Sequence, residues 1–70
     1  MLSKQEKALV GEYSQLRDKF NAGLAKVVEL ERLARIEDIL VYKYKFTWDE
    51  LFDAQFGVEH LVANLGRVYP

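Results

Sequence analysis

The strongest pattern in this chain lies in residues 9–34, LVGEYSQLRDKFNAGLAKVVELERLA. Apolar or small residues recur there in alternating steps of four and three, at Leu9, Tyr13, Leu16, Phe20, Gly23, Val27, Leu30 and Ala34. This spacing is a heptad repeat, the pattern of a helix that packs one stripe against a neighbouring helix. We therefore expect an all-α protein whose long first helix associates with another copy of the chain.

Gly23 lies inside this heptad stripe. A glycine in a helix interior costs about 1 kcal/mol relative to alanine, so its presence requires a structural reason. Either two helix backbones approach each other closely at Gly23, or the first helix bends there. The sequence leaves both alternatives open.

The stretch 35–46 leaves its secondary structure open. Ile36 and Leu40 project away from the heptad stripe whereas Val41 returns to it, which indicates a kink or a helix end near the start of this stretch. Residues 42–46, YKYKF, alternate aromatic and basic side chains, as a short half-buried strand does. Because no partner strand is apparent, we favour a helix end whose lysines face the negative end of the helix dipole.

Two capping boxes predict two helix starts. Ser3 with Glu6, and Thr47 with Glu50, each place a hydroxyl at the cap position and a carboxylate three residues later. In this arrangement the hydroxyl and the carboxylate accept hydrogen bonds from backbone N–H groups that the helix leaves unpaired. Phe46, just before the second cap, adds a hydrophobic staple to that helix start.

The second helix is expected to run from Trp48 to about Leu65 and to end at Gly66. Its apolar residues spread over more than half of the helix circumference, whereas a helix with one neighbour needs a stripe a little over ~100° wide. We therefore expect this helix, Trp48 included, to pack against the first helix and against another subunit. The expected architecture is a helical hairpin, one domain over residues 1–70, that assembles into a homo-oligomer.

Composition narrows the functional classes. Ten Lys and Arg residues against eleven Asp and Glu residues give a formal charge of -1, so no overall field attracts nucleic acid. The chain has no cysteine, hence no disulfides, and a chain of 70 residues hides only ~60% of its unfolded surface. Oligomerisation is the expected source of further burial. Since the first residues form no hydrophobic signal core, we expect a cytoplasmic protein, in the host cell if it is viral.

The sequence shows no constellation for catalysis, so we expect a protein that is not an enzyme and holds no cofactor. His60, the only histidine, has no carboxylate or second histidine at metal-ligand spacing, which predicts no metal site. It shares a polar face with Asp53 and Asn64. Residues 42–45 could stack on and neutralise a nucleic acid strand, but the balanced charge favours half-buried tyrosines.

Gln55 and Glu59 are the polar residues that the pattern singles out. They stand one helical turn apart within the apolar arc of the expected second helix, where an unpaired polar group is costly. They either fix the register of a subunit interface, as a polar residue does in a coiled coil, or line a ligand pocket between subunits.

Residues 48–54, WDELFDA, and residues 65–70, LGRVYP, resemble the second helix of the phage sponge proteins that defeat cyclic-nucleotide anti-phage signalling. In that family a helical hairpin opens its second helix with tryptophan and closes it with Leu-x-Arg and a proline. Its members form multi-subunit rings that hold cyclic di- or trinucleotides at subunit junctions without cleaving them, and a related hairpin binds cyclic ADP-ribose-type signals. Residues 56–61, FGVEHL, and the Tyr-Lys repeat before Thr47 depart from the family pattern.

The resemblance implies a non-enzymatic oligomer that sequesters a cyclic nucleotide messenger between subunits. Arg67 corresponds to the arginine of the Leu-x-Arg element and would bind phosphate. Tyr13 and Lys26 are the nearest counterparts of the aromatic residue and the lysine that contact base and phosphate from the first helix. Together with Gln55 and Glu59 they form the candidate ligand-binding set.

The residues alone also allow a second function, the binding of a host protein. The wide apolar arc of the second helix, or residues 42–46, would dock a host protein as an amphipathic helix docks in a groove. The protein would then be a small helical binding module or inhibitor. A structural subunit without any ligand is the third alternative.

Overall fold

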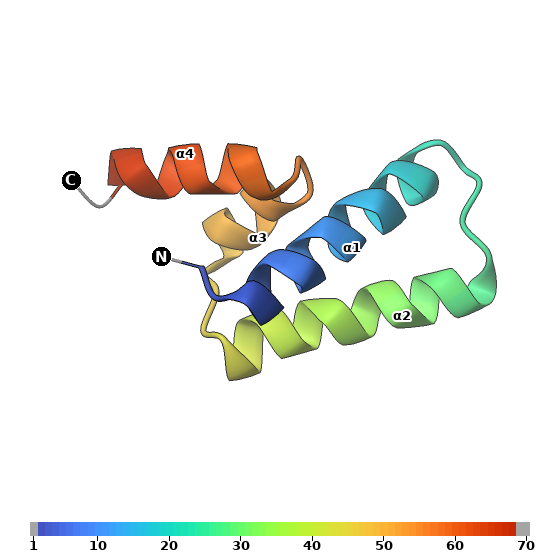
Figure 1. The fold of residues 1–70 in the computed structure, drawn as a ribbon. Coiled ribbons are helices and arrows are strands. Elements are labelled where there is room, and N and C mark those ends of the chain that lie inside the picture. The colour runs from blue at the N-terminus through green and yellow to red at the C-terminus, as the bar shows by residue number, and fades with distance from the viewer. Residues whose placement is uncertain (1, 69–70) are drawn as a thin grey trace.

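The computed structural model describes the backbone of residues 2–68 and the side chains of residues 2–64. Within that part of the chain all regular structure is helical, which confirms the all-α prediction. The elements are α1 (Lys4–Asn21), α2 (Val27–Asp38), the π-helical segment η1 (Ile39–Lys43), α3 (Trp48–Ala54) and α4 (Val58–Val68). Helix α1 lies in the middle, with the antiparallel α2 on one side and α3 and α4 on the other (Figure 1).

Both predicted capping boxes are confirmed. The Ser3 hydroxyl accepts from the Glu6 N–H at 3.1 Å, and the Glu6 carboxylate accepts from the Ser3 N–H at 2.9 Å. Thr47 and Glu50 repeat the arrangement with the same two distances at the start of α3. The starts of α1 and α3 therefore follow from local chemistry.

The predicted long first helix is wrong, because it ends at Asn21 and α2 begins at Val27. Gly23 adopts a φ of 73°, and its N–H donates to the Phe20 carbonyl at 3.0 Å. The Leu24 N–H donates to the Lys19 carbonyl at 2.9 Å. These two bonds form a Schellman motif, which ends a helix with a left-handed glycine. Gly23 thus marks neither a close approach nor a bend, but a helix end.

The break reverses the chain, and the core differs from the predicted heptad stripe. Ile36 and Leu40 were expected to project away from the packing, yet both are fully buried. Conversely, the heptad positions Val27, Leu30 and Ala34 are exposed. The buried apolar side chains are Leu2, Val10, Tyr13, Leu33, Ile36, Leu40, Phe46, Leu51, Ala54 and Leu61.

The α-helix ends at Asp38, near the start of the stretch 35–46 as expected, but the chain does not leave the helix there and continues as a π-helix to Lys43. Helix α2 widens into η1, where the Tyr44 N–H donates to the Ile39 carbonyl at 3.2 Å. The Phe46 N–H then closes the turn on the Leu40 carbonyl at 2.9 Å. The favoured helix end is confirmed, and the strand alternative is wrong.

Lys45 closes this turn with a φ of 61°, a left-handed conformation that a Cβ disfavours. We expect Lys45→Gly to raise the unfolding free energy by about 0.5 to 1 kcal/mol, because glycine adopts this φ without steric cost. Thermal unfolding followed by circular dichroism measures the effect. Lys45→Ala is the matched control, since it removes the charge but keeps the Cβ. Equal melting temperatures for Lys45→Gly and wild type would contradict the inference that the backbone is strained at Lys45.

The predicted second helix is also interrupted. Helix α3 ends at Ala54, and Gly57, with a φ of 109°, precedes α4. The Gly57 carbonyl accepts from the Leu61 N–H at 3.1 Å, and the Ser14 hydroxyl of α1 donates to the Gln55 carbonyl at 3.1 Å. The turn is thereby tied to the central helix. The predicted helix end at Gly66 is wrong, because α4 continues to Val68.

Candidate functional site

Tyr13, the candidate base-stacking residue, is buried in the core on α1. Its hydroxyl donates to the Glu37 carboxylate of α2 at 2.8 Å. Burial raises the pKa of Tyr13 well above its usual range, and the hydrogen bond to Glu37 adds to the increase. Within a single chain, Tyr13 therefore joins α1 to α2.

Tyr13 predicts a loss of stability in alkaline solution. The folded protein keeps the phenol proton, whereas the unfolded chain releases it near the ordinary pKa of 10.0. The contribution of Tyr13 to the unfolding free energy is thus complete below that pH and falls as the pH rises above it. We expect Tyr13→Phe to cost about 1 kcal/mol at neutral pH and to flatten the alkaline decline.

Urea unfolding between about pH 8 and pH 11 measures this dependence. The exposed Tyr42 provides the control, because Tyr42→Phe removes a phenol that the core does not cover. If Tyr13→Phe and Tyr42→Phe give the same pH profile, the assignment to Tyr13 is wrong.

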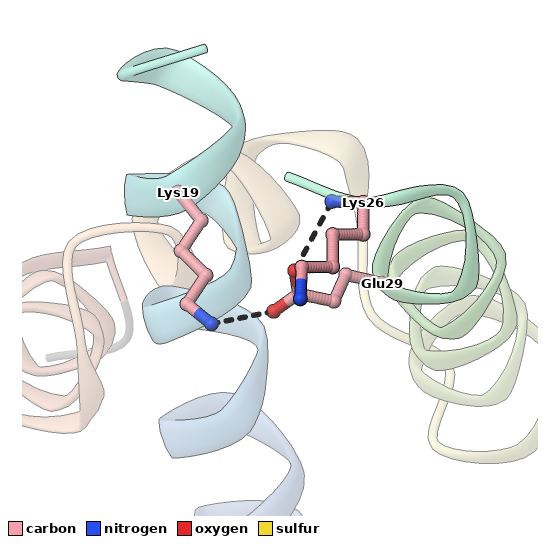
Figure 2. Close-up of polar contacts among 3 residues, drawn as sticks. All are labelled: Lys19, Lys26 and Glu29. Atoms are coloured by element: carbon pink, nitrogen blue, oxygen red, sulfur yellow. Dashed lines mark hydrogen bonds and ion pairs between the residues drawn. The ribbon is translucent and has the colours of Figure 1, made fainter. Parts of the chain in front are cut away.

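Lys26, the second candidate, lies in the turn between α1 and α2 at the N-cap of α2. Its backbone N–H donates to one Glu29 oxygen at 3.1 Å, and the Lys19 ammonium of α1 pairs with the other at 2.6 Å (Figure 2). The hydrogen bond from Lys19 and then that from Lys26 lower the pKa of Glu29. The Lys26 backbone thus helps to hold Glu29 between the two helices.

A second ion pair joins α1 to α2. The Arg32 guanidinium donates two hydrogen bonds to the Glu12 carboxylate, at 2.7 and 2.9 Å. This bidentate contact lowers the pKa of Glu12 and raises that of Arg32. Both pairs lie on the surface and orient the two helices more than they stabilise them.

Gln55 and Glu59 do not lie one turn apart on one helix, which corrects the prediction. Gln55 is the C-cap of α3, whereas Glu59 is exposed in the first turn of α4. The Arg67 side chain lies outside the described residues, as does Pro70 of the resemblance. Among the described side chains, no hydrogen bond or ion pair joins Tyr13, Lys26, Gln55 and Glu59 to one another.

His60 has the two neighbours that its spacing predicts. Its Nε2 lies 2.8 Å from the Asn64 side-chain nitrogen and 3.4 Å from an Asp53 carboxylate oxygen. No group of three or more His, Cys, Asp and Glu side chains in the described part of the chain is placed to hold a metal ion. Asp53, His60 and Asn64 form a polar group at the surface, in which His60 is the shared neighbour.

The largest departure from the sequence prediction is an exposed row of aromatic side chains, which we call the aromatic ridge: Trp48, Phe52 and Phe56. Their exposed fractions are 76%, 62% and 58%, although Trp48 was expected to be packed. Trp48 and Phe52 stand one turn apart on α3. The ring of Phe56 lies edge-on to Phe52 at 5.5 Å and extends the row to His60 at 5.0 Å.

The aromatic ridge lies in an acidic part of the chain. Residues 47–64 contain Asp49, Glu50, Asp53 and Glu59 but no lysine or arginine.

The apolar arc expected for the second helix has one half that is buried in the core and faces away from the aromatic ridge. This half includes Leu51, Ala54 and Leu61. The wide apolar arc is thus covered on its inner side, and its outer side carries the ridge. In the sequence, the only sign of the aromatic ridge is that Trp48, Phe52 and Phe56 follow one another at intervals of four residues.

Comparison with known proteins gives no functional assignment. The chain matches no protein-family model, no curated protein and no solved structure at a significant level. Among the described residues, no helix has both the length and the apolar composition needed to cross a membrane.

Proposed function

We propose that the protein is a non-enzymatic interaction module that binds a partner protein through the aromatic ridge. The observation that supports this proposal is the exposure of Trp48, Phe52 and Phe56, which follow one another at intervals of four residues, with Phe52 and Phe56 in ring contact. Aromatic side chains dominate the binding energy of protein interfaces, and a helix presents them to a groove at spacings of three and four.

The size of the aromatic ridge supports a binding role. Each aromatic side chain contributes 150–250 Å² when buried, so the exposed parts of three of them amount to roughly 300 to 500 Å². That area is as large as the largest apolar patch of a typical monomer, which is often functional. It is also sufficient for the central part of an interface that covers about 800 Å² on each partner.

The acidic side chains near the aromatic ridge specify the chemistry of the partner. Asp49 and Glu59 are exposed, and Lys and Arg are absent from residues 47–64. A complementary surface is an apolar groove bordered by lysine and arginine side chains. Such a pairing accelerates association and weakens as salt rises.

Sequestration of a cyclic nucleotide stays a prediction. Within one chain, Tyr13 is buried in the core and Lys26 lies in the turn between α1 and α2, so these two candidate residues do not form a binding site together. Sequestration would therefore require residues from a second subunit. Calorimetry with a panel of cyclic di- and trinucleotides and cyclic ADP-ribose isomers distinguishes the two functions. The ridge proposal expects no heat of binding, and saturable heat would favour sequestration.

A selection of short peptides from a random library tests the ridge proposal, because it requires no identified partner. Peptides are selected on the wild type alone, and the enriched peptides are then tested for binding to the Phe52→Ala/Phe56→Ala variant. We expect the enriched peptides to combine apolar residues with lysine or arginine. Enriched peptides that bind the variant as well as the wild type, or that carry net negative charge, would contradict the proposal.

A further inference from the structure

Helix α2 carries a second uncovered apolar surface, far from α3, which we call the outer stripe: Val27, Leu30 and Ala34. Val27 is 71% exposed, Leu30 is 38% exposed and Ala34 is exposed as well. These are the heptad positions of α2, and they lie outside the core of the chain, where α2 buries Leu33 and Ile36 instead.

Charged side chains border the outer stripe at the positions that select a helical partner. With Val27 and Ala34 at the first heptad position (a) and Leu30 at the fourth (d), Glu31 takes position e, and Lys26, the N-cap residue directly before the helix, stands at the place of position g. Both side chains are exposed, and among the described residues neither belongs to an ion pair of 4.0 Å or less.

The spacing of these two charges favours one occupant and one orientation. In a parallel helix pair, position g of one chain faces position e of the next heptad on the other chain, five residues further on. Lys26 of each copy would then face Glu31 of the other copy, twice per pair. In an antiparallel pair centred on the outer stripe, position e of one copy lies near position e of the other, so Glu31 of the two copies would lie near each other and repel.

We propose that the outer stripe is a self-association surface, on which α2 of a second copy packs in parallel about a two-fold axis. The outer stripe is separate from the aromatic ridge, so this inference does not depend on the proposed function. Because the outer stripe spans only three heptad positions, the contact belongs to the small, transient class of interfaces. The self-complementary charges distinguish a second copy from an unrelated partner.

Two neighbouring valines provide a matched test. Val27 lies on the outer stripe and is 71% exposed, whereas Val28 lies off it and is 68% exposed. Sedimentation equilibrium at protein concentrations up to about 1 mM detects weak dimers in this range. We expect Val27→Asp to raise the dimer dissociation constant at least about tenfold, and Val28→Asp to leave it unchanged. Circular dichroism of both variants checks that the fold persists.

A charge exchange tests the orientation. Lys26→Glu alone and Glu31→Lys alone place like charges opposite each other and should weaken the dimer, and the double exchange should restore it. A wild-type protein that stays monomeric throughout this concentration range overturns the inference. Equal effects of Val27→Asp and Val28→Asp also overturn it, as does a double exchange without recovery.

Discussion

Ile36→Ala is expected to unfold much of this protein at physiological temperature. Ile36 has no exposed surface and lies in the contact between α2 and the central helix. Truncation of a buried isoleucine to alanine costs 2–5 kcal/mol, of the same order as the whole stability of a domain of this length. The expected fall in melting temperature is at least about 8 °C. Thermal unfolding monitored by circular dichroism measures it.

Leu30→Ala is the control for this prediction. Leu30 lies on the same helix, but it belongs to the heptad stripe and retains 38% exposure. Alanine is a good helix former, so in the monomer the substitution should cost less than about 1 kcal/mol. If Leu30→Ala destabilised the dilute protein more than Ile36→Ala does, the heptad stripe would be the true core, and the described packing would be wrong.

The second large effect is expected on binding. Phe52→Ala with Phe56→Ala removes two of the three aromatic side chains of the ridge and leaves Trp48 as a fluorescent probe. Truncation of a central aromatic residue typically costs 2 kcal/mol or more, so the pair should weaken a ridge-directed peptide or protein at least about a hundredfold. Titration calorimetry with a selected peptide measures the loss.

Leu24→Ala separates this effect from a general loss of apolar surface. Leu24 is 71% exposed but lies in the turn between α1 and α2, away from the aromatic ridge. We expect wild-type affinity from Leu24→Ala and a wild-type helical spectrum from both variants. A comparable loss from Leu24→Ala would show that binding is non-specific.

Local signals predicted much of the secondary structure. The two capping boxes fixed the starts of α1 and α3, because Ser3 and Thr47 satisfy backbone donors within three residues. Together with the heptad spacing of residues 9–34, these boxes predicted an all-α chain. These inferences depend only on contacts between residues that are close in sequence.

The tertiary packing could not be predicted in the same way, because two glycines changed the direction of the chain. Gly23 fits the heptad spacing, so the pattern counted it as part of a continuous helix, although its left-handed φ ends α1. Gly57 interrupts the second helix for the same reason. Once α2 folds back on α1, the tertiary contacts select Leu33, Ile36 and Leu40 for the core over the heptad stripe.

The candidate site was predicted least well. Sequence spacing identified the neighbours of His60 and the wide apolar arc of the second helix, but not which half of the arc stays uncovered. Leu51, Ala54 and Leu61 take the inner half, and this choice depends on where α1 lies. Exposure of Trp48 is therefore a property of the packed chain.

Trp48 also reports directly on the aromatic ridge, because it is the only tryptophan and is 76% exposed. Its fluorescence emission can be recorded while a selected basic, apolar peptide is added to the wild type. We expect a solvent-exposed indole in the free protein and a saturable blue shift on binding, and we expect binding to become weaker at high salt. Binding that saturates by calorimetry while the Trp48 emission stays unchanged would contradict the assignment of the aromatic ridge as the interaction surface.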